Sequence, residues 1–243
     1  MIPYILKNID KLFFNCDTVP RPRTWDSLDG LKMKSQDIGI LLKLICLHKR
    51  EKGLLSSFGH NGWEDWEWGL ENELIGDWHP TKSAEDFVIT EYSVRSLADS
   101  TGISKSQVNL ALQRCFNVGL AKRDRNLDVP RTNTKALTEF IVYGLRYVFP
   151  AKLGSVTRGI ATSLGAPILK DKLMSTGELI PVWTDARGNT KGQAVEPLFK
   201  SVTHAVRRDP ELYALLALVD AIRIGQPRER NVAINVLQEH LGG

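Results

Sequence analysis

Residues 93–117, SVRSLADSTGISKSQVNLALQRCFN, constrain the fold most, because their spacing is typical of two helices joined by a sharp turn. Gly102 marks the turn, since glycine adopts a positive φ without a Cβ penalty. Ala98, four residues earlier, is small enough for the second helix to cross close above it. Val108, six residues after the glycine, is apolar and fills the wedge between the helices. The pattern predicts a helix-turn-helix, and the alternative is a helical hairpin packed into a core.

The second helix of this pair has a start signal and a polar outer face. Ser104 offers an N-cap oxygen and Gln107 follows three residues later, which predicts a capping box. No acidic residue lies between Lys105 and Asn117. Asn and Gln hydrogen-bond adenine edges, Ser bonds to either base type, and Lys and Arg bind phosphates or guanine. We therefore expect contacts with double-stranded DNA at Ser104, Lys105, Ser106, Asn109, Gln113, Arg114 and Asn117.

The flanking segments complete the pattern of a winged helix. Residues 87–90 are β-branched and apolar, which predicts a small strand before the helix pair. Residues 121–131 predict a hairpin after it, turning near Arg125 and Asn126. As the wing, this hairpin would offer phosphates or the minor groove four cationic side chains: Lys122, Arg123, Arg125 and Arg131. Asp124 and Asp128 dilute that charge, so an ordinary solvated loop is the alternative.

Composition bounds the remaining possibilities. The 243 residues suffice for one large domain or two small ones, and a net charge of +4 is too small to indicate nucleic-acid binding by itself. Three isolated cysteines without a CxxC pair argue against a disulfide framework and a zinc site. No run of eighteen apolar residues and no signal-peptide core is present. We expect a cytoplasmic protein without membrane contact, metal or cofactor.

The first half of the chain divides into an extension and a winged domain. Residues 1–34 are irregular and form the predicted N-terminal extension. Ser35 is the predicted cap of a helix from Gln36 to about Lys52, the first helix of a winged helix-turn-helix domain over residues 35–150.

Within that domain, residues 56–86 form a predicted insertion with four tryptophans and eight acidic residues against one lysine. Such a surface cannot approach phosphates, so it contacts a protein partner or, as we favour, folds back on its own domain. The spacing of its His and acidic residues fits no metal-ligand pattern.

The second half is predicted to be a small α+β module over residues 151–243. Before it, Thr134 is the predicted cap of a helix that continues to Val148 and closes the winged domain. We favour a plain core role for this helix, and a dimer contact is the alternative. Residues 151–167 are rich in Gly and Thr and predict an ordered loop, without the pattern of a P-loop. Extended segments follow, and then two helices, one capped by Asp209 and one from about Pro227 to the end.

The stretch from Ser35 to about Arg131 resembles the winged helix-turn-helix transcriptional regulators of bacteria, broadly the MarR-like group. Residues 147–152 and 209–220 are similar to segments that recur in such regulators. The resemblance implies a mainly α fold with small β, sequence-directed DNA binding as a homodimer, and no catalytic residues. The acidic insertion departs from a plain MarR-like domain. The expected function is that of a dimeric repressor.

Two other function classes are open to a chain of this kind. One is an antitoxin-like or other protein-binding regulator, in which the winged helix binds DNA while the insertion or the C-terminal module holds a partner protein. The other is an enzyme, which the sequence disfavours because it shows no metal-ligand spacing and no nucleophile motif. His48 lies next to Lys49 on a predicted helix surface, and His204 and His240 are isolated along the chain. We expect each to be a solvated or hydrogen-bonded side chain and not a catalytic base.

Overall fold

The computed structural model describes residues 32–54, 65–66, 90–170, 172 and 179–241. Its contacts divide the chain into two units, Met1–Lys32 and Met33–Gly243, and the elements below belong to the second. The described residues are mainly helical, with a two-stranded sheet and a three-stranded barrel. The predicted extension (residues 1–34), the predicted strand at 87–90 and the insertion at 56–86 fall almost entirely outside them.

Three helices open the described fold: α1 (Ser35–Glu51), α3 (Val94–Thr101) and α4 (Lys105–Asn117). The N-cap of α1 is Lys34, not the predicted Ser35, and the backbone N–H of Lys34 donates to the Asp37 carboxylate at 2.9 Å. Gly102 ends α3 with a φ of 68°, so the turn lies at the predicted glycine.

The Ser104 hydroxyl accepts from the Gln107 backbone at the start of α4, as predicted. The reciprocal half of the predicted capping box is missing, because the Gln107 carboxamide oxygen accepts from the Gln36 side chain at 3.1 Å instead. This bond connects the start of α4 to the first turn of α1.

A hairpin and a broken helix follow. Strands β1 (Ala121–Arg123) and β2 (Pro130–Thr132) pair antiparallel, which confirms a hairpin in the predicted segment. Asn133, not Thr134, caps α5 (Thr134–Tyr143) by accepting from the Ala136 backbone. The predicted single helix breaks at Gly144, and α6 (Leu145–Val148) is a separate short turn.

The C-terminal half begins with a closed barrel of three strands: β3 (Leu153–Ala161), β4 (Pro181–Thr184) and β5 (Thr190–Val195). The predicted loop at 151–167 is therefore wrong, since most of it is a strand that pairs antiparallel with both β4 and β5. Short helices η2 (Ser163–Gly165) and α7 (Pro167–Lys170) follow β3. The chain then ends in α8 (Val202–Arg208), α9 (Pro210–Ile224) and α10 (Pro227–Leu241), with Asp209 capping α9 as predicted.

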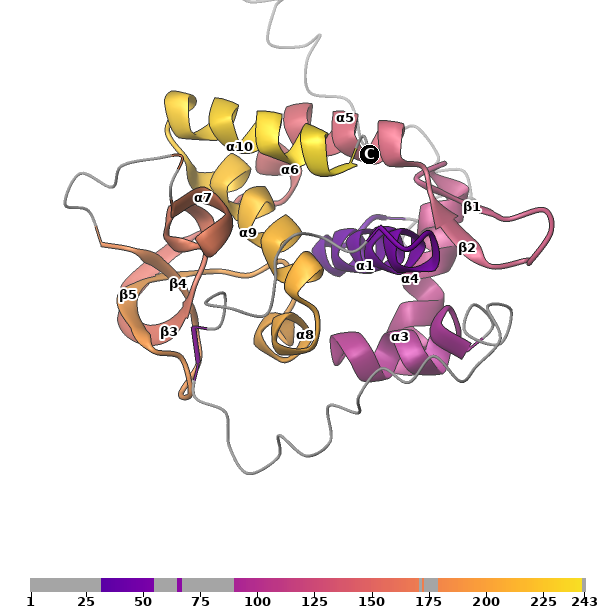
Figure 1. The fold of residues 1–243 in the computed structure, drawn as a ribbon, viewed down its shortest axis with the longest axis horizontal. Helices are drawn as coiled ribbons and strands as arrows, with labels where there is room; N and C mark the ends of the chain where they lie inside the picture. Colours follow the sequence, from indigo (N-terminus) through magenta and orange to yellow (C-terminus); the bar gives the residue numbers. More distant parts are fainter. Residues whose placement is uncertain (1–31, 55–64, 67–89, 171, 173–178, 242–243) are drawn as a thin grey trace, which may run out of the picture. The chain divides into compact units, whose positions relative to one another are not determined.

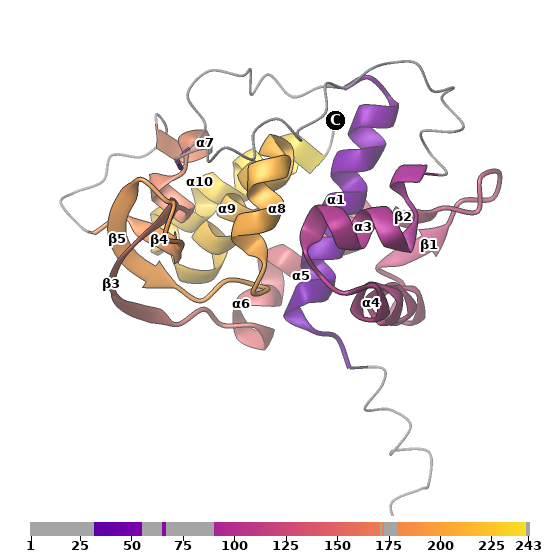
Figure 2. The same cartoon turned by 90° about the horizontal axis from the view of Figure 1, so that it is seen from below.

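One hydrophobic core runs through both halves of the described chain. Helix α1 contacts α4 and β2 on one side and α9 on the other, and α9 is buried along nearly its whole length. Figures 1 and 2 show the barrel and the hairpin on opposite sides of α1. The core residues before and after position 150, the predicted domain boundary, form a single cluster. The packing therefore has no break at that position.

Two described residues of the predicted insertion lie on the barrel. Trp66 is 3% exposed, pairs with Gly188 as a β-bridge and packs edge-on against Tyr213. The Asp65 carboxylate accepts from the backbone of Ala161 and the hydroxyl of Thr190. This part of the insertion folds back on its own chain, as favoured above, although on the C-terminal half and not on the predicted winged domain.

Candidate nucleic-acid interface

Helix α4 divides cleanly into a buried and an exposed side. Its inward residues are apolar and belong to the core: Val108, Ala111, Leu112 and Cys115. Burial raises the pKa of the Cys115 thiol to about 12, so this cysteine is a neutral packing group. Six of the seven residues expected to touch DNA from this helix and its cap are exposed: Ser104, Lys105, Ser106, Asn109, Gln113 and Asn117. They form an acid-free face of hydroxyls, carboxamides and one ammonium group.

Arg114 does not belong to this face, which corrects the prediction. Its side chain is buried, and its Nε and Nη2 donate to the two oxygens of Asp37 at 2.8 and 2.6 Å. The two-point ion pair raises the pKa of the Arg114 guanidinium further and fixes α4 against the first turn of α1. Arg114 therefore positions α4 from its buried side, through the contact with α1.

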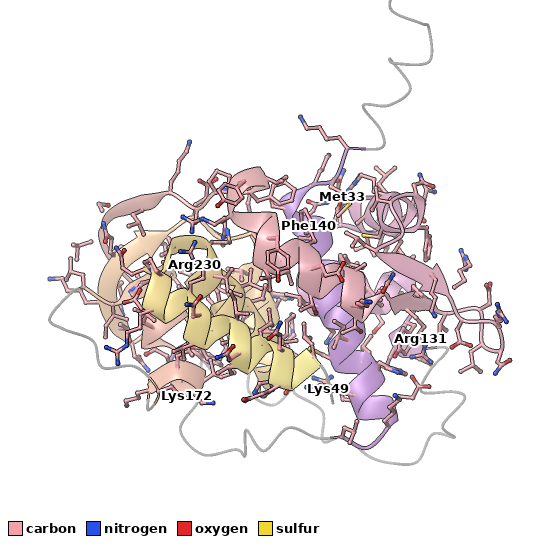
Figure 3. All side chains as sticks on the ribbon, turned by 90° about the horizontal axis from the view of Figure 1, so that it is seen from above. Met33, Lys49, Arg131, Phe140, Lys172 and Arg230 are labelled. Atoms are coloured by element: carbon pink, nitrogen blue, oxygen red, sulfur yellow. The ribbon has the colours of Figure 1, made fainter. Side chains whose placement is uncertain are left out.

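Arg131 is also turned inward, contrary to the prediction that it reaches phosphates. Its guanidinium donates to both oxygens of Glu51 at 2.5 and 2.9 Å and lies 4.8 Å from the centre of the Tyr92 ring. Figure 3 shows it beside α1, the helix that also carries Lys49. The hydrogen bonds from Arg131 lower the pKa of Glu51, which keeps the pair charged. Arg131 thus ties the hairpin to α1.

The other cations of the hairpin point outward. Lys122 and Arg125 are exposed, and neither has a partner among the described residues. Arg123 is partly occupied: it pairs with Asp128 at 3.2 Å and lies over the Phe116 ring, but 60% of its side chain stays exposed. An exposed pair of this kind exchanges readily for a phosphate.

Asp124 has a structural role in the turn of the hairpin. Its carboxylate accepts from the backbone N–H groups of Asn126 and Leu127 at 2.9 and 3.2 Å, which lowers its pKa. Asp124 also contacts the inward Arg131 at 3.4 Å. The aspartate therefore shapes the turn and stays ionised there.

Helix α8 braces the turn between α3 and α4. The Ser201 hydroxyl donates to the carbonyl of Thr101 at 2.8 Å, and the His204 ring contacts the carbonyl of Asp99 at 3.0 Å. The sequence gives no signal for this contact, because the partners lie about a hundred residues apart. The sequence-based prediction of the site also did not include two cations near this turn, Arg95 on α3 and Arg208 on α8. Both line a pocket between the two helices.

Other kinds of site find little support in the described part of the chain. No group of three or more His, Cys, Asp or Glu residues there is arranged to hold a metal ion. Arg158, in the segment that was predicted to be a loop, donates to the carbonyl of Gly188 within the barrel. No helix in the described ranges combines the length and apolar character needed to cross a bilayer. No known protein family, curated protein or solved structure matches the chain.

Proposed function

We propose that this protein binds double-stranded DNA through the outer face of α4 and the adjacent hairpin, as a sequence-specific transcriptional regulator with a winged helix-turn-helix. The observation that carries the proposal is the face of α4, on which carboxamides, hydroxyls and a lysine are exposed without an acidic residue. A helix of this length spans about 20 Å, and the major groove of B-DNA is wide enough to admit an α-helix.

Fewer residues are available to contact DNA than the sequence predicts. Arg114 and Arg131 are not available to DNA, because both are buried in ion pairs. Asn109 and Gln113, one turn apart on the exposed face, are the side chains best suited to read adenine edges. Lys122 and Arg125 at the hairpin, with Lys105 at the start of α4, are suited to phosphates.

The proposal includes a homodimer that acts as a repressor in the cytoplasm, where DNA is accessible. Two copies would read two half-sites about one helical turn apart. The described surface supports a partner contact at α5 and α6, where Tyr143, Tyr147 and Val148 are 75%, 76% and 54% exposed. Exposed aromatic side chains close together are typical of surfaces that a second molecule covers.

The described residues of the insertion do not favour the protein-partner alternative. Trp66, the tryptophan of the insertion that the structure describes, is buried against its own chain and is not available as an anchor for another protein. We therefore retain DNA binding as the proposed activity.

Selection of bound genomic fragments, followed by binding measurements on an enriched sequence, tests the proposal. Enrichment of a palindrome supports the dimeric regulator. Asn109→Ala and Gln113→Ala should each relax the base preference, by about 1–3 kcal/mol for each lost two-point base contact. Lack of any enriched sequence, or an unchanged preference in both variants, would contradict readout by α4.

A salt titration tests the hairpin separately. Lys122→Ala and Arg125→Ala should weaken binding to all sequences alike, and each should reduce the slope of log K against log[salt] by about 0.9. Lys191→Ala, which removes an exposed lysine from the barrel strand β5, is the matched control and should leave the slope unchanged. Equal slopes in the hairpin variants and the control would mean that the hairpin does not contact phosphate.

A further inference from the structure

An open surface pocket of about 450 Å³ lies between α3 and α8, outside the proposed DNA-reading face. Helices α3 and α8 lie side by side in Figures 1 and 2. The described residues that line it carry hydroxyl, guanidinium and carboxylate groups: Thr90, Ser93, Arg95, Ser96, Asp99, Ser100 and Arg208.

The charges of the lining favour an anion. The described lining includes two arginines, one on each helix, and one acidic residue, Asp99, while the Glu91 carboxylate contacts the lining residue Ser96. Arg95 is exposed and has no partner among the described residues. Arg208 uses its Nη1 to contact His204 and the Asp99 carbonyl, and its Nε and Nη2 are without a partner in the described part of the chain. Both guanidinium groups therefore keep donors for a ligand.

Three hydroxyl groups lie along the same face of α3, and among the described residues that of Ser93 keeps its O–H for a ligand. Ser93, Ser96 and Ser100 are spaced by three and four residues, so they share one side of the helix. The Ser93 oxygen accepts from the Ser96 backbone, and the Ser96 hydroxyl donates to Glu91 at 3.3 Å. Ser100 donates to the carbonyl of Leu97. Arginine is over-represented at phosphate sites, because the planar fork of its guanidinium group matches phosphate oxygens at two points.

We propose that this pocket binds a phosphate group, held by Arg95 and Arg208. The source of the phosphate is either a small phosphorylated molecule or the DNA backbone. Both present the same tetrahedral oxyanion to the two guanidinium groups. Because α8 also braces the turn before α4 through Ser201, a phosphate between α3 and α8 stabilises the arrangement that positions the DNA-reading helix.

Calorimetric titration of the full chain with inorganic pyrophosphate, at constant ionic strength in chloride, tests the site without DNA. Saturable binding is expected, and Arg95→Gln and Arg208→Gln should each weaken it about tenfold or more, because each removes a charge-assisted hydrogen bond. Arg228→Gln, which removes an exposed arginine from α10, is the matched control and should bind as the wild type does. Absence of saturable binding, or wild-type affinity in both pocket variants, would overturn the proposal.

The salt dependence of DNA binding then identifies the source. A backbone phosphate in the pocket predicts that Arg95→Gln reduces the salt slope by about 0.9 and that pyrophosphate competes with DNA. A small phosphorylated ligand predicts an unchanged slope in the absence of pyrophosphate. Binding of pyrophosphate through these arginines without any binding of DNA would support the phosphate site and contradict the proposed function. Failure of the phosphate site can therefore be distinguished from failure of the proposed function.

Discussion

Asp209 shows at the scale of one residue how the two halves of the protein are joined. Its buried carboxylate accepts from Lys43 Nζ at 2.8 Å and from Arg50 at 2.7 Å, both on α1, while it also caps α9. Lys43 is itself only 3% exposed. A buried carboxylate stays ionised only when such partners compensate for the hydration that it loses on burial.

Because of these partners, we expect the protein to lose stability in acid. Burial by itself raises the pKa of Asp209, but Lys43 and Arg50 outweigh it and the pKa is lowered. The unfolded chain therefore binds the proton more readily, with an aspartate pKa of about 3.9. The stabilisation is present above about pH 4 and is lost as the pH falls through the lowered pKa of the folded state. Asp209→Asn should cost about 3–5 kcal/mol at pH 7, since it leaves two cations without their anion.

Urea unfolding at pH 7 and in stepwise acid measures both effects. Asp128→Asn is a suitable control, because the Asp128 side chain is 81% exposed and asparagine tolerates its positive φ. This control should change stability by less than about 0.5 kcal/mol. If Asp209→Asn keeps the acid dependence of the wild type, another carboxylate governs it.

At the scale of elements, the turn between α3 and α4 depends on both a backbone conformation and a neighbour. Gly102 and Gly53 have the same φ of 68°, but their surroundings differ. A Cβ at Gly102 would lie 2.8 Å from the Cβ of Ser201, whereas a Cβ at Gly53 would meet nothing within 4 Å. The two positions therefore separate the cost of the conformation from the cost of the contact with α8.

We expect Gly53→Ala to destabilise the protein by about 1–2 kcal/mol, the cost of a left-handed conformation with a side chain. Gly102→Ala should cost about 1–3 kcal/mol more, because α8 must move away from the turn. Thermal or urea unfolding of the two variants measures the difference. Equal losses of stability would show that α8 does not press on the turn.

The sequence predicts the ends of helices well where a few adjacent residues are enough to fix the backbone. Gly102, Ser104 and the Asp209–Pro210 start of α9 all act through their own backbone neighbourhood, and the structure confirms each. The segment at 151–167 was predicted wrongly as a loop, because glycine and threonine are compatible with loops and strands alike. Gly159 is required there for a tertiary reason: a Cβ would lie 2.1 Å from the carbonyl oxygen of Trp183 on β4.

At the scale of the whole molecule, the continuous core predicts that residues 33–243 unfold as one cooperative unit. Leu97 on α3 and Leu237 on α10 are both fully buried and belong to the same cluster, although they lie on either side of position 150. Leu97→Ala and Leu237→Ala should each lower a single unfolding transition, by about 2–5 kcal/mol. Circular dichroism and tryptophan fluorescence, followed through the same urea titration, should give coincident curves.

Two separated transitions, with each substitution affecting only one of them, would instead support two domains that meet near position 150. The ion pairs of Asp209 and the burial of α9 on nearly all sides argue against that outcome. Separate domains seldom share buried charges, because each charge would lose its partner whenever the domains part.

Local signals in the sequence predict the helix-turn-helix pattern of residues 93–117, because its glycine, its N-cap and its apolar period act within a few residues of one another. The sequence also identified the exposed polar side of α4. Which cations lie on that side depends on tertiary contacts. Nothing in the sequence separates Arg114 and Arg131 from Lys105 and Arg125. In the folded chain, Arg114 and Arg131 are buried because they form ion pairs with carboxylates of α1, which are distant in sequence. The pocket between α3 and α8 likewise exists only in the folded chain, since its two arginines are more than a hundred residues apart.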